Sequence, residues 1–150
     1  MDAVSYPDVK VSNFIIDKVV PLRIPADAQP LSTEFQIHWT PTLVTLDMYG
    51  KEHYRTVGFL PPEELVPSLI LGIAKVDFAA QQYNDALINL NMLLAGYPAS
   101  SAAPEAVFLK GVSGYKSSKD ATYLKKAYEQ LAGSYPASEW TKRATPYSLL

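Results

Sequence analysis

The chain has 150 residues, of which 48% are apolar and 19% charged, a balance typical of one globular domain or of two small units that share a core. Its net charge of -2 gives no basic face for nucleic acid, and the absence of cysteine excludes disulfides, thiolate nucleophiles and cysteine-based metal sites. No apolar run is long enough to span a bilayer and no signal peptide is visible, so we expect no membrane partner and a cytoplasmic location.

The first part of the chain carries two helix candidates and one strand candidate. Residues 8–18 place apolar side chains at helical spacing, and residues 31–35 are a second, short helix candidate. Residues 19–24 form a β-branched, apolar run that predicts a short strand. Pro21 has no N–H to give to a neighbour, which places this strand at the edge of a sheet.

A β-hairpin is the clearest local prediction. Residues 42–46 and 52–57 are strand-like runs, and the turn between them contains Asp47 and Gly50. Glycine adopts the positive φ angle that a tight hairpin requires. We therefore expect an antiparallel pair joined at this turn.

Everything after Gly58 is predicted to be helical. Prolines and two acidic residues at positions 61–64 suit the first turn of a helix, because acids complement its dipole. This helix is expected to dock on the sheet through one apolar stripe. The stripe consists of Leu65, Leu69, Ile73 and Val76.

The helical half contains an internal repeat. Tyr97-Pro98-Ala99-Ser100 recurs as Tyr135-Pro136-Ala137-Ser138, and an apolar helix precedes both copies. The spacing between the two copies is the period of the repeat. Helix–turn–helix units that recur at such a spacing and are closed by proline are typical of tetratricopeptide repeats. Ala86 supplies the small residue that this pattern needs in the first copy, whereas Leu124 stands at the equivalent place in the second. Two such units need another surface to stack on, and the first half of the chain is the candidate.

Trp39-Thr40-Pro41-Thr42, followed by a hairpin and by Gly58, resembles the second half of a thioredoxin-like domain. The resemblance covers roughly residues 1–72. It implies an incomplete α/β thioredoxin-like unit, followed over residues 73–150 by tetratricopeptide-like helical hairpins, as in a group of bacterial thioredoxin-family proteins. It also implies a cis Thr40–Pro41 bond. The first strand and the Cys-x-x-Cys motif of that family are missing.

The resemblance implies that Trp39, Thr40 and Pro41 contribute to a surface that binds extended peptides. The alternative is that they only shape the loop and bury Trp39. We expect a non-catalytic protein-binding or scaffolding module, with no cofactor, no metal and a protein or peptide as partner. The competing hypothesis is the C-terminal part of a thiol–disulfide oxidoreductase whose Cys-x-x-Cys lies upstream of Met1.

Other residues favour ordinary structural roles. His38 and His53 belong to no spaced metal-ligand motif, so a loop and a strand-face position are expected for them. Glu63 and Glu64 are adjacent on a helix and point apart, which argues against an acid–base pair. The aromatic residues of the helical half are expected to pack between helices, with one or two available for a partner groove.

The missing strand has a structural consequence. In the thioredoxin-like order it lies between residues 19–24 and residues 42–46, so two strands would face an empty slot. Unpaired buried backbone groups cost about 1–3 kcal/mol each. Three outcomes are therefore open: direct antiparallel pairing of the two strands, donation of a strand by another protein or by a second copy of the chain, or a loosely ordered N-terminal third. Among these, self-association through strand pairing is a specific expectation.

Overall fold

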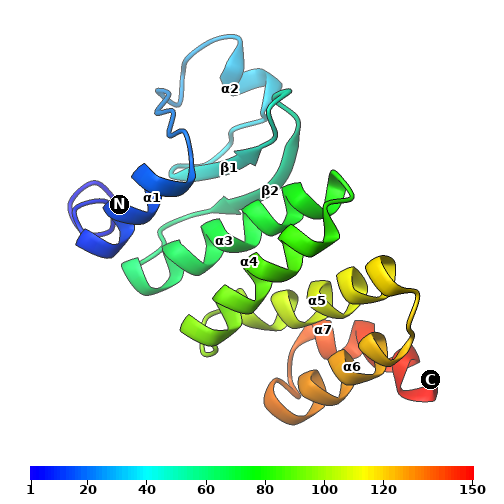
Figure 1. Ribbon diagram of the computed structural model, residues 1–150. Coiled ribbons are helices and arrows are strands. Elements are labelled where there is room, and N and C mark those ends of the chain that lie inside the picture. The colour runs from blue at the N-terminus through cyan, green and yellow to red at the C-terminus, as the bar shows by residue number, and fades with distance from the viewer.

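A computed structural model describes all residues, 1–150, as seven α-helices, one 3-10 helix and a two-stranded sheet (Figure 1). The elements in chain order are α1 (Val9–Lys18), α2 (Leu31–Glu34), β1 (Thr42–Leu46), β2 (Glu52–Val57), α3 (Pro62–Ala79), α4 (Tyr83–Gly96), α5 (Ala103–Ser118), α6 (Thr122–Ser134), α7 (Glu139–Ala144) and the 3-10 helix η1 (Thr145–Leu149). None of the helices combines the length and the apolar character needed to cross a membrane.

The predicted hairpin is confirmed. β1 and β2 pair antiparallel, with Thr45 opposite Tyr54. The turn is held by the Asp47 carboxylate, which accepts hydrogen bonds from the backbone N–H groups of Tyr49 at 2.9 Å and Lys51 at 3.0 Å. Gly50 has the positive φ of 81° expected of it.

Both N-terminal helix predictions are also confirmed, each to within one residue. α1 is capped by the Asp8 carboxylate, which accepts from the N–H groups of Lys10 at 2.9 Å and Val11 at 3.1 Å. Such a cap satisfies two of the N–H groups that a helix start leaves unpaired. Only Val11 of α1 is fully buried, and it joins the main core.

The predicted strand at residues 19–24 is wrong. These residues form no ladder, because the sheet contains β1 and β2 alone. Residues 20–24 are exposed to solvent, and Val20 is 97% and Leu22 80% exposed. A β-branched run favours the extended conformation but becomes a strand only when a neighbour offers hydrogen bonds, and no neighbour is in reach here. Direct pairing of this segment with residues 42–46 is therefore also absent.

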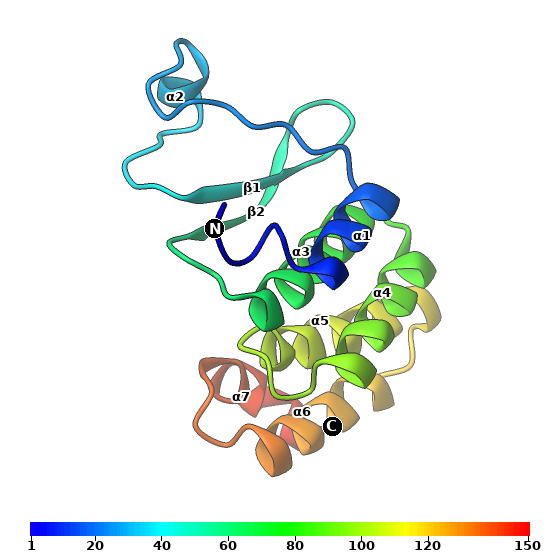
Figure 2. The same cartoon turned by 90° about the vertical axis from the view of Figure 1, so that its left-hand side faces the viewer.

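α3 is the central element and lies between the hairpin and α4 (Figures 1 and 2). Towards the hairpin, Gly72 lets the backbone of α3 approach Thr45 closely, and the Lys75 ammonium lies 4.4 Å from the ring centre of Tyr54. Towards α4, Asn89 donates a hydrogen bond to the Asp77 carboxylate at 2.8 Å. The docking of the helical half on the sheet through this helix is confirmed.

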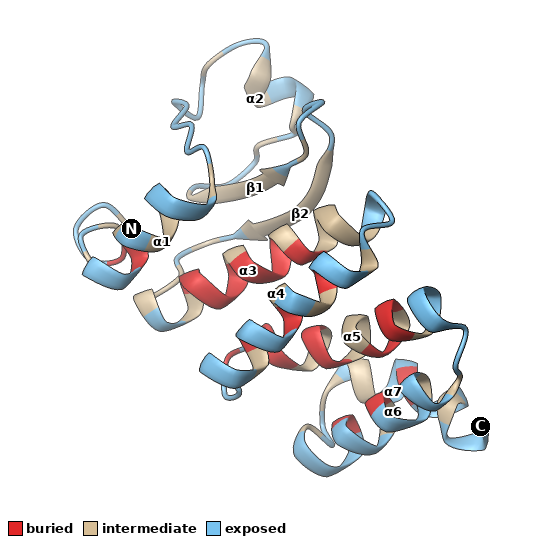
Figure 3. Ribbon diagram, in the orientation of Figure 1, coloured by how far each residue is buried: buried red, intermediate tan, exposed pale blue.

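The predicted buried stripe of α3 needs correction. Of its four members only Leu65 is fully buried, and Leu69, Ile73 and Val76 are half-buried. The most buried positions include Val66, Ile70, Leu71 and Ala74. α3 packs against the hairpin on one side and against α4 and α5 on others, so burial spreads over more of its circumference than a single stripe assumes (Figure 3).

The repeated tetrapeptide has the same local structure in both copies. Tyr97 ends α4 and donates its N–H to the Leu93 carbonyl at 2.7 Å, while Tyr135 ends α6 and donates to the Leu131 carbonyl at 2.8 Å. The φ and ψ angles agree as well, at -138° and 50° for Tyr97 and at -135° and 51° for Tyr135. The helices therefore follow one another as two similar hairpins, α3–α4 and α5–α6.

Candidate functional site

The outer edge of β1 has no pairing partner. The N–H of Gly58 donates to the Pro41 carbonyl at 2.8 Å, which fixes the register of the ladder. In an antiparallel pair the backbone groups of successive residues point alternately towards and away from the neighbour. The N–H and C=O groups of Thr42 and Val44 therefore point away from β2, where the sheet ends. An open strand edge of this kind is a template for pairing with another chain.

A second unpaired segment lies on the same side. Residues 19–24 lead from α1 towards α2 and lie on the side of β1 that is opposite to β2 (Figures 1 and 2). Val19 has extended backbone angles, with φ of -137° and ψ of 160°. Apart from the N–H of Val19, which caps α1, the backbone of residues 19–24 makes no hydrogen bond. Two unpaired stretches of chain thus flank the open side of the hairpin.

A cavity of about 270 Å³ lies where these two stretches end. It is lined by Ala26, Ile37, His38, Trp39 and Thr40. Ala26 follows the extended segment, whereas His38, Trp39 and Thr40 lead into β1. Residues that adjoin the two stretches therefore border one open space, which is lined by three apolar residues and by His38 and Thr40.

The three predicted binding residues have different environments. Trp39 is 67% exposed, so the alternative in which the loop buries this ring is wrong. Thr40 is also exposed, and its peptide bond with Pro41 is cis, as is the bond between Gln29 and Pro30. Pro41 is half-buried, and the Trp39 carbonyl accepts a hydrogen bond from the Thr42 hydroxyl at 2.6 Å. Trp39 and Thr40 therefore border the cavity, whereas Pro41 belongs to the start of the ladder.

Arg55 ties the cavity loop to the sheet. Its guanidinium donates to the Phe35 carbonyl at 2.7 Å and forms two bonds with the Glu52 carboxylate, at 2.6 and 2.8 Å. These bonds, together with the charge of Arg55, hold the pKa of Glu52 below its usual range. The loop that carries Trp39 is thereby anchored at its start by Arg55 and at its end by the ladder.

The histidines occupy the expected positions. His38 is exposed in the cavity loop, and His53 lies on β2 with Nε2 2.8 Å from an Asp47 oxygen. This bond, followed by those from the N–H groups of Lys51 and Tyr49, holds the pKa of Asp47 below its usual value. No three His, Asp or Glu side chains gather closely enough to hold a metal ion. His53 thus secures the hairpin turn.

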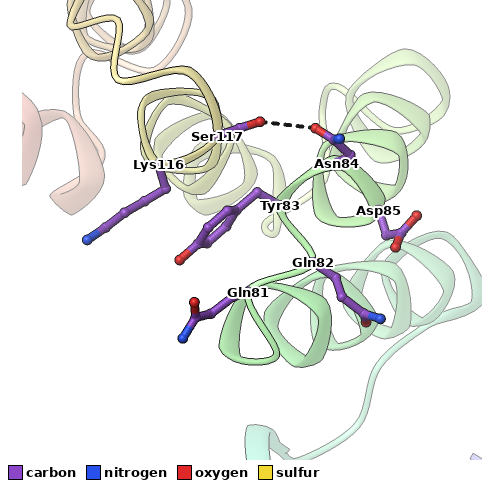
Figure 4. A pocket seen from close by; sticks show the side chains of 7 residues that line it. All are labelled: Gln81, Gln82, Tyr83, Asn84, Asp85, Lys116 and Ser117. Carbon is purple, nitrogen blue, oxygen red and sulfur yellow. Dashed lines mark hydrogen bonds between the residues drawn. The ribbon is translucent and has the colours of Figure 1, made fainter.

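A second cavity, of about 310 Å³, lies at the turn between α3 and α4 beside the end of α5 (Figure 4). Seven residues line it, and only Tyr83 is hydrophobic. The Ser117 hydroxyl donates to the Asn84 amide oxygen at 3.1 Å, so two of the polar groups satisfy each other. With neither apolar lining nor a buried polar group, this cavity is a poorer binding site than the one beside Trp39.

Comparison of the chain with protein-family models, with curated proteins and with solved structures gives no match.

The sequence did not indicate every residue of this site. Ala26 and Ile37 line the cavity only because the turns around residues 25–37 bring them beside Trp39, and neither has a distinctive sequence pattern. The free amide of Val44 follows from the ladder register, which the sequence leaves undetermined. One feature of the sequence did indicate an open sheet edge: it contains only one predicted hairpin, and a sheet of two strands always has open edges.

Proposed function

We propose that this chain is a non-catalytic protein-binding module that takes up an extended segment of a partner along the outer edge of β1. The observation that carries the proposal is the unpaired edge at Thr42 and Val44 beside the exposed ring of Trp39. Strand addition supplies affinity through main-chain hydrogen bonds and specificity through pockets for side chains. Here the β1 edge provides the bonds and the cavity provides the pocket.

Two further features support a binding role. No residue of the hairpin is fully buried, whereas the buried residues concentrate in α3, α4 and α5 (Figure 3). A two-stranded hairpin is only marginally stable alone, and a further strand would stabilise it. The chain also offers no sulfur nucleophile, so it catalyses no thiol–disulfide exchange.

The sequence resemblance points the same way. In a thioredoxin-like unit the position next to residues 42–46 belongs to the first strand, and the proposed segment would lie there. In this proposal, residues 1–72 correspond to part of a thioredoxin-like unit, and residues 73–150 are tetratricopeptide-like hairpins that serve as its scaffold. The self-association expected from the sequence uses the same edge, with a second copy as the partner.

Peptide selection on the intact protein tests the proposal. A phage-displayed library of random peptides is selected on the wild-type chain, and the enriched peptides are then measured against two variants. Val44→Pro removes the outward N–H without breaking a bond to β2, because that N–H points away from β2. Val44→Thr keeps the N–H and is the matched control. We expect the selected peptides to bind the wild type and Val44→Thr, and to lose binding to Val44→Pro.

Amide exchange gives an independent measurement. The ladder should protect the N–H groups of Leu43 and Thr45, whereas those of Thr42 and Val44 exchange freely. A bound segment should slow exchange at Thr42 and Val44. Peptides that bind Val44→Pro as tightly as wild type, or that leave these two amides unprotected, would show that the edge is not the site. Sedimentation at micromolar concentration then shows whether a second copy competes for it.

A further inference from the structure

We propose that the partner segment is a basic one: an extended strand that places a bulky apolar side chain in the Trp39 cavity and a lysine or arginine directly beside it. This inference rests on the proposed function and adds the chemistry of the partner. It follows from the position of the cavity relative to β1 and from the charges around it.

The direction of the segment follows from strand energetics. The cavity lies before the first residue of β1, because Trp39 and Thr40 precede Thr42. Antiparallel pairing is slightly more stable per residue than parallel pairing. Residues 19–24 are a weaker pairing partner for the segment than β1, because Pro21 lacks an N–H. The segment therefore runs antiparallel to β1, which brings its C-terminal end to the cavity.

The size and lining of the cavity determine the side chain at that end. A space of about 270 Å³ bordered by Ala26, Ile37 and Trp39 suits an aromatic or branched aliphatic group. Such a neighbour would remove the most apolar surface of the exposed Trp39 ring from water, because aromatic side chains carry a large apolar area. A small or polar side chain would leave this lining in contact with water.

The charges that lie near the cavity along the chain and take part in no ion pair are negative, because Arg23 is paired with Asp2 and Arg55 with Glu52. Residues 25–50 contain no lysine or arginine. Asp47 in this stretch is bonded to His53, whereas Asp27 and Glu34 take part in no ion pair. Both are exposed, Asp27 is adjacent to Ala26 of the cavity, and Glu34 ends α2 close before Ile37. Complementary charge steers association and disfavours partners of like charge, so a basic residue fits this end of the site.

Synthetic peptides of about seven residues test this, since that length spans the five residues of β1. The reference peptide alternates valine and threonine and ends in phenylalanine followed by an amidated lysine. One relative has alanine for phenylalanine, and another has glutamate for lysine. Binding is measured by the emission of Trp39 in a Trp140→Phe background, which leaves Trp39 as the single tryptophan.

We expect the alanine peptide to bind about tenfold or more weakly, because it leaves the cavity unfilled. The glutamate peptide should bind about two- to tenfold more weakly, and this difference should shrink in high salt. Asp27→Asn combined with Glu34→Gln should abolish the preference for lysine while leaving the affinity of the glutamate peptide unchanged or higher. Both positions are exposed, so the fold does not depend on them.

Two results overturn the inference. If the lysine and glutamate peptides bind equally and still require the N–H of Val44, the edge binds segments but does not select basic ones, and the proposed function stands alone. If the alanine and phenylalanine peptides bind equally, the cavity receives no side chain. Binding that ignores Val44→Pro, by contrast, refutes the proposed function itself.

Discussion

Gly72→Ala tests the contact that joins the two halves of the molecule. A Cβ at position 72 would lie 2.5 Å from Thr45 Oγ1 and 3.1 and 3.2 Å from Thr45 Cβ and Cγ2, so either α3 or β1 must move. Overpacking of this kind typically costs about 1–3 kcal/mol, whereas alanine in a helix interior gains about 1 kcal/mol over glycine. We therefore expect a net loss of up to about 2 kcal/mol in the free energy of unfolding.

Two matched variants separate the steric effect from helix propensity. Gly133→Ala in α6 meets nothing within 4 Å and should stabilise the protein by up to about 1 kcal/mol. Thr45→Ala removes Oγ1 and Cγ2, so the penalty of Gly72→Ala should shrink in that background by about 0.5–3 kcal/mol. Urea unfolding followed by circular dichroism measures all of these. If Gly72→Ala stabilises the chain as Gly133→Ala does, α3 does not press against β1.

Four other outcomes follow from single sites. Leu71→Ala, at a fully buried position, should lower the free energy of unfolding by about 2–5 kcal/mol and Leu69→Ala by clearly less; the reverse order in urea unfolding would show that the buried face of α3 is misassigned. Gln81→Gly should stabilise by about 0.5–1 kcal/mol, because Gln81 has a φ of 61° that suits glycine, and unchanged stability would contradict this. Burial raises the pKa of Asp77, so the folded state binds its proton more tightly than the unfolded state and stability falls as pH rises above the ordinary aspartate value. Asp77→Asn stays neutral and can keep the bond from Asn89, so its stability relative to wild type should be higher at pH 7 than at pH 4; an equal difference at both pH values would refute the role of burial. The purified chain should reduce no protein disulfide above a buffer control, and catalysed reduction would contradict the argument from its missing thiols.

The sequence predicts those elements whose causes are local. The helical spacing of apolar residues in residues 8–18, the turn at Asp47 and Gly50, and the proline–acid start of α3 are each set by residues close to one another in the chain. The tetrapeptide at Tyr97 and Tyr135 likewise closes both helices through bonds to the preceding turn. Such features need no knowledge of distant neighbours, which is why their positions agree with the structure to within a residue or two.

The remaining features depend on long-range neighbours. Residues 19–24 have the composition of a strand, yet a strand requires a partner, and partner identity is not encoded in a short run. The stripe of α3 was misplaced because a helix covered on several sides has no single apolar face. For the site, Trp39 and Thr40 were indicated by the resemblance, but their exposure and their approach to Ala26 depend on how residues 25–37 fold back.

The uneven distribution of burial links stability to the proposed binding role. The main core is built largely from α3, α4 and α5, and the hairpin adds only half-buried side chains such as Leu43 and Tyr54 to it. The hairpin is therefore held mainly from one side, through Gly72 and Lys75 of α3. Regions with few buried contacts open most easily. Binding sites that must accept an additional segment of polypeptide lie in such regions. In the proposed complex, a strand added to β1 would complete hydrogen bonds that the fold leaves open, and the helical half would support the hairpin through its contacts with α3.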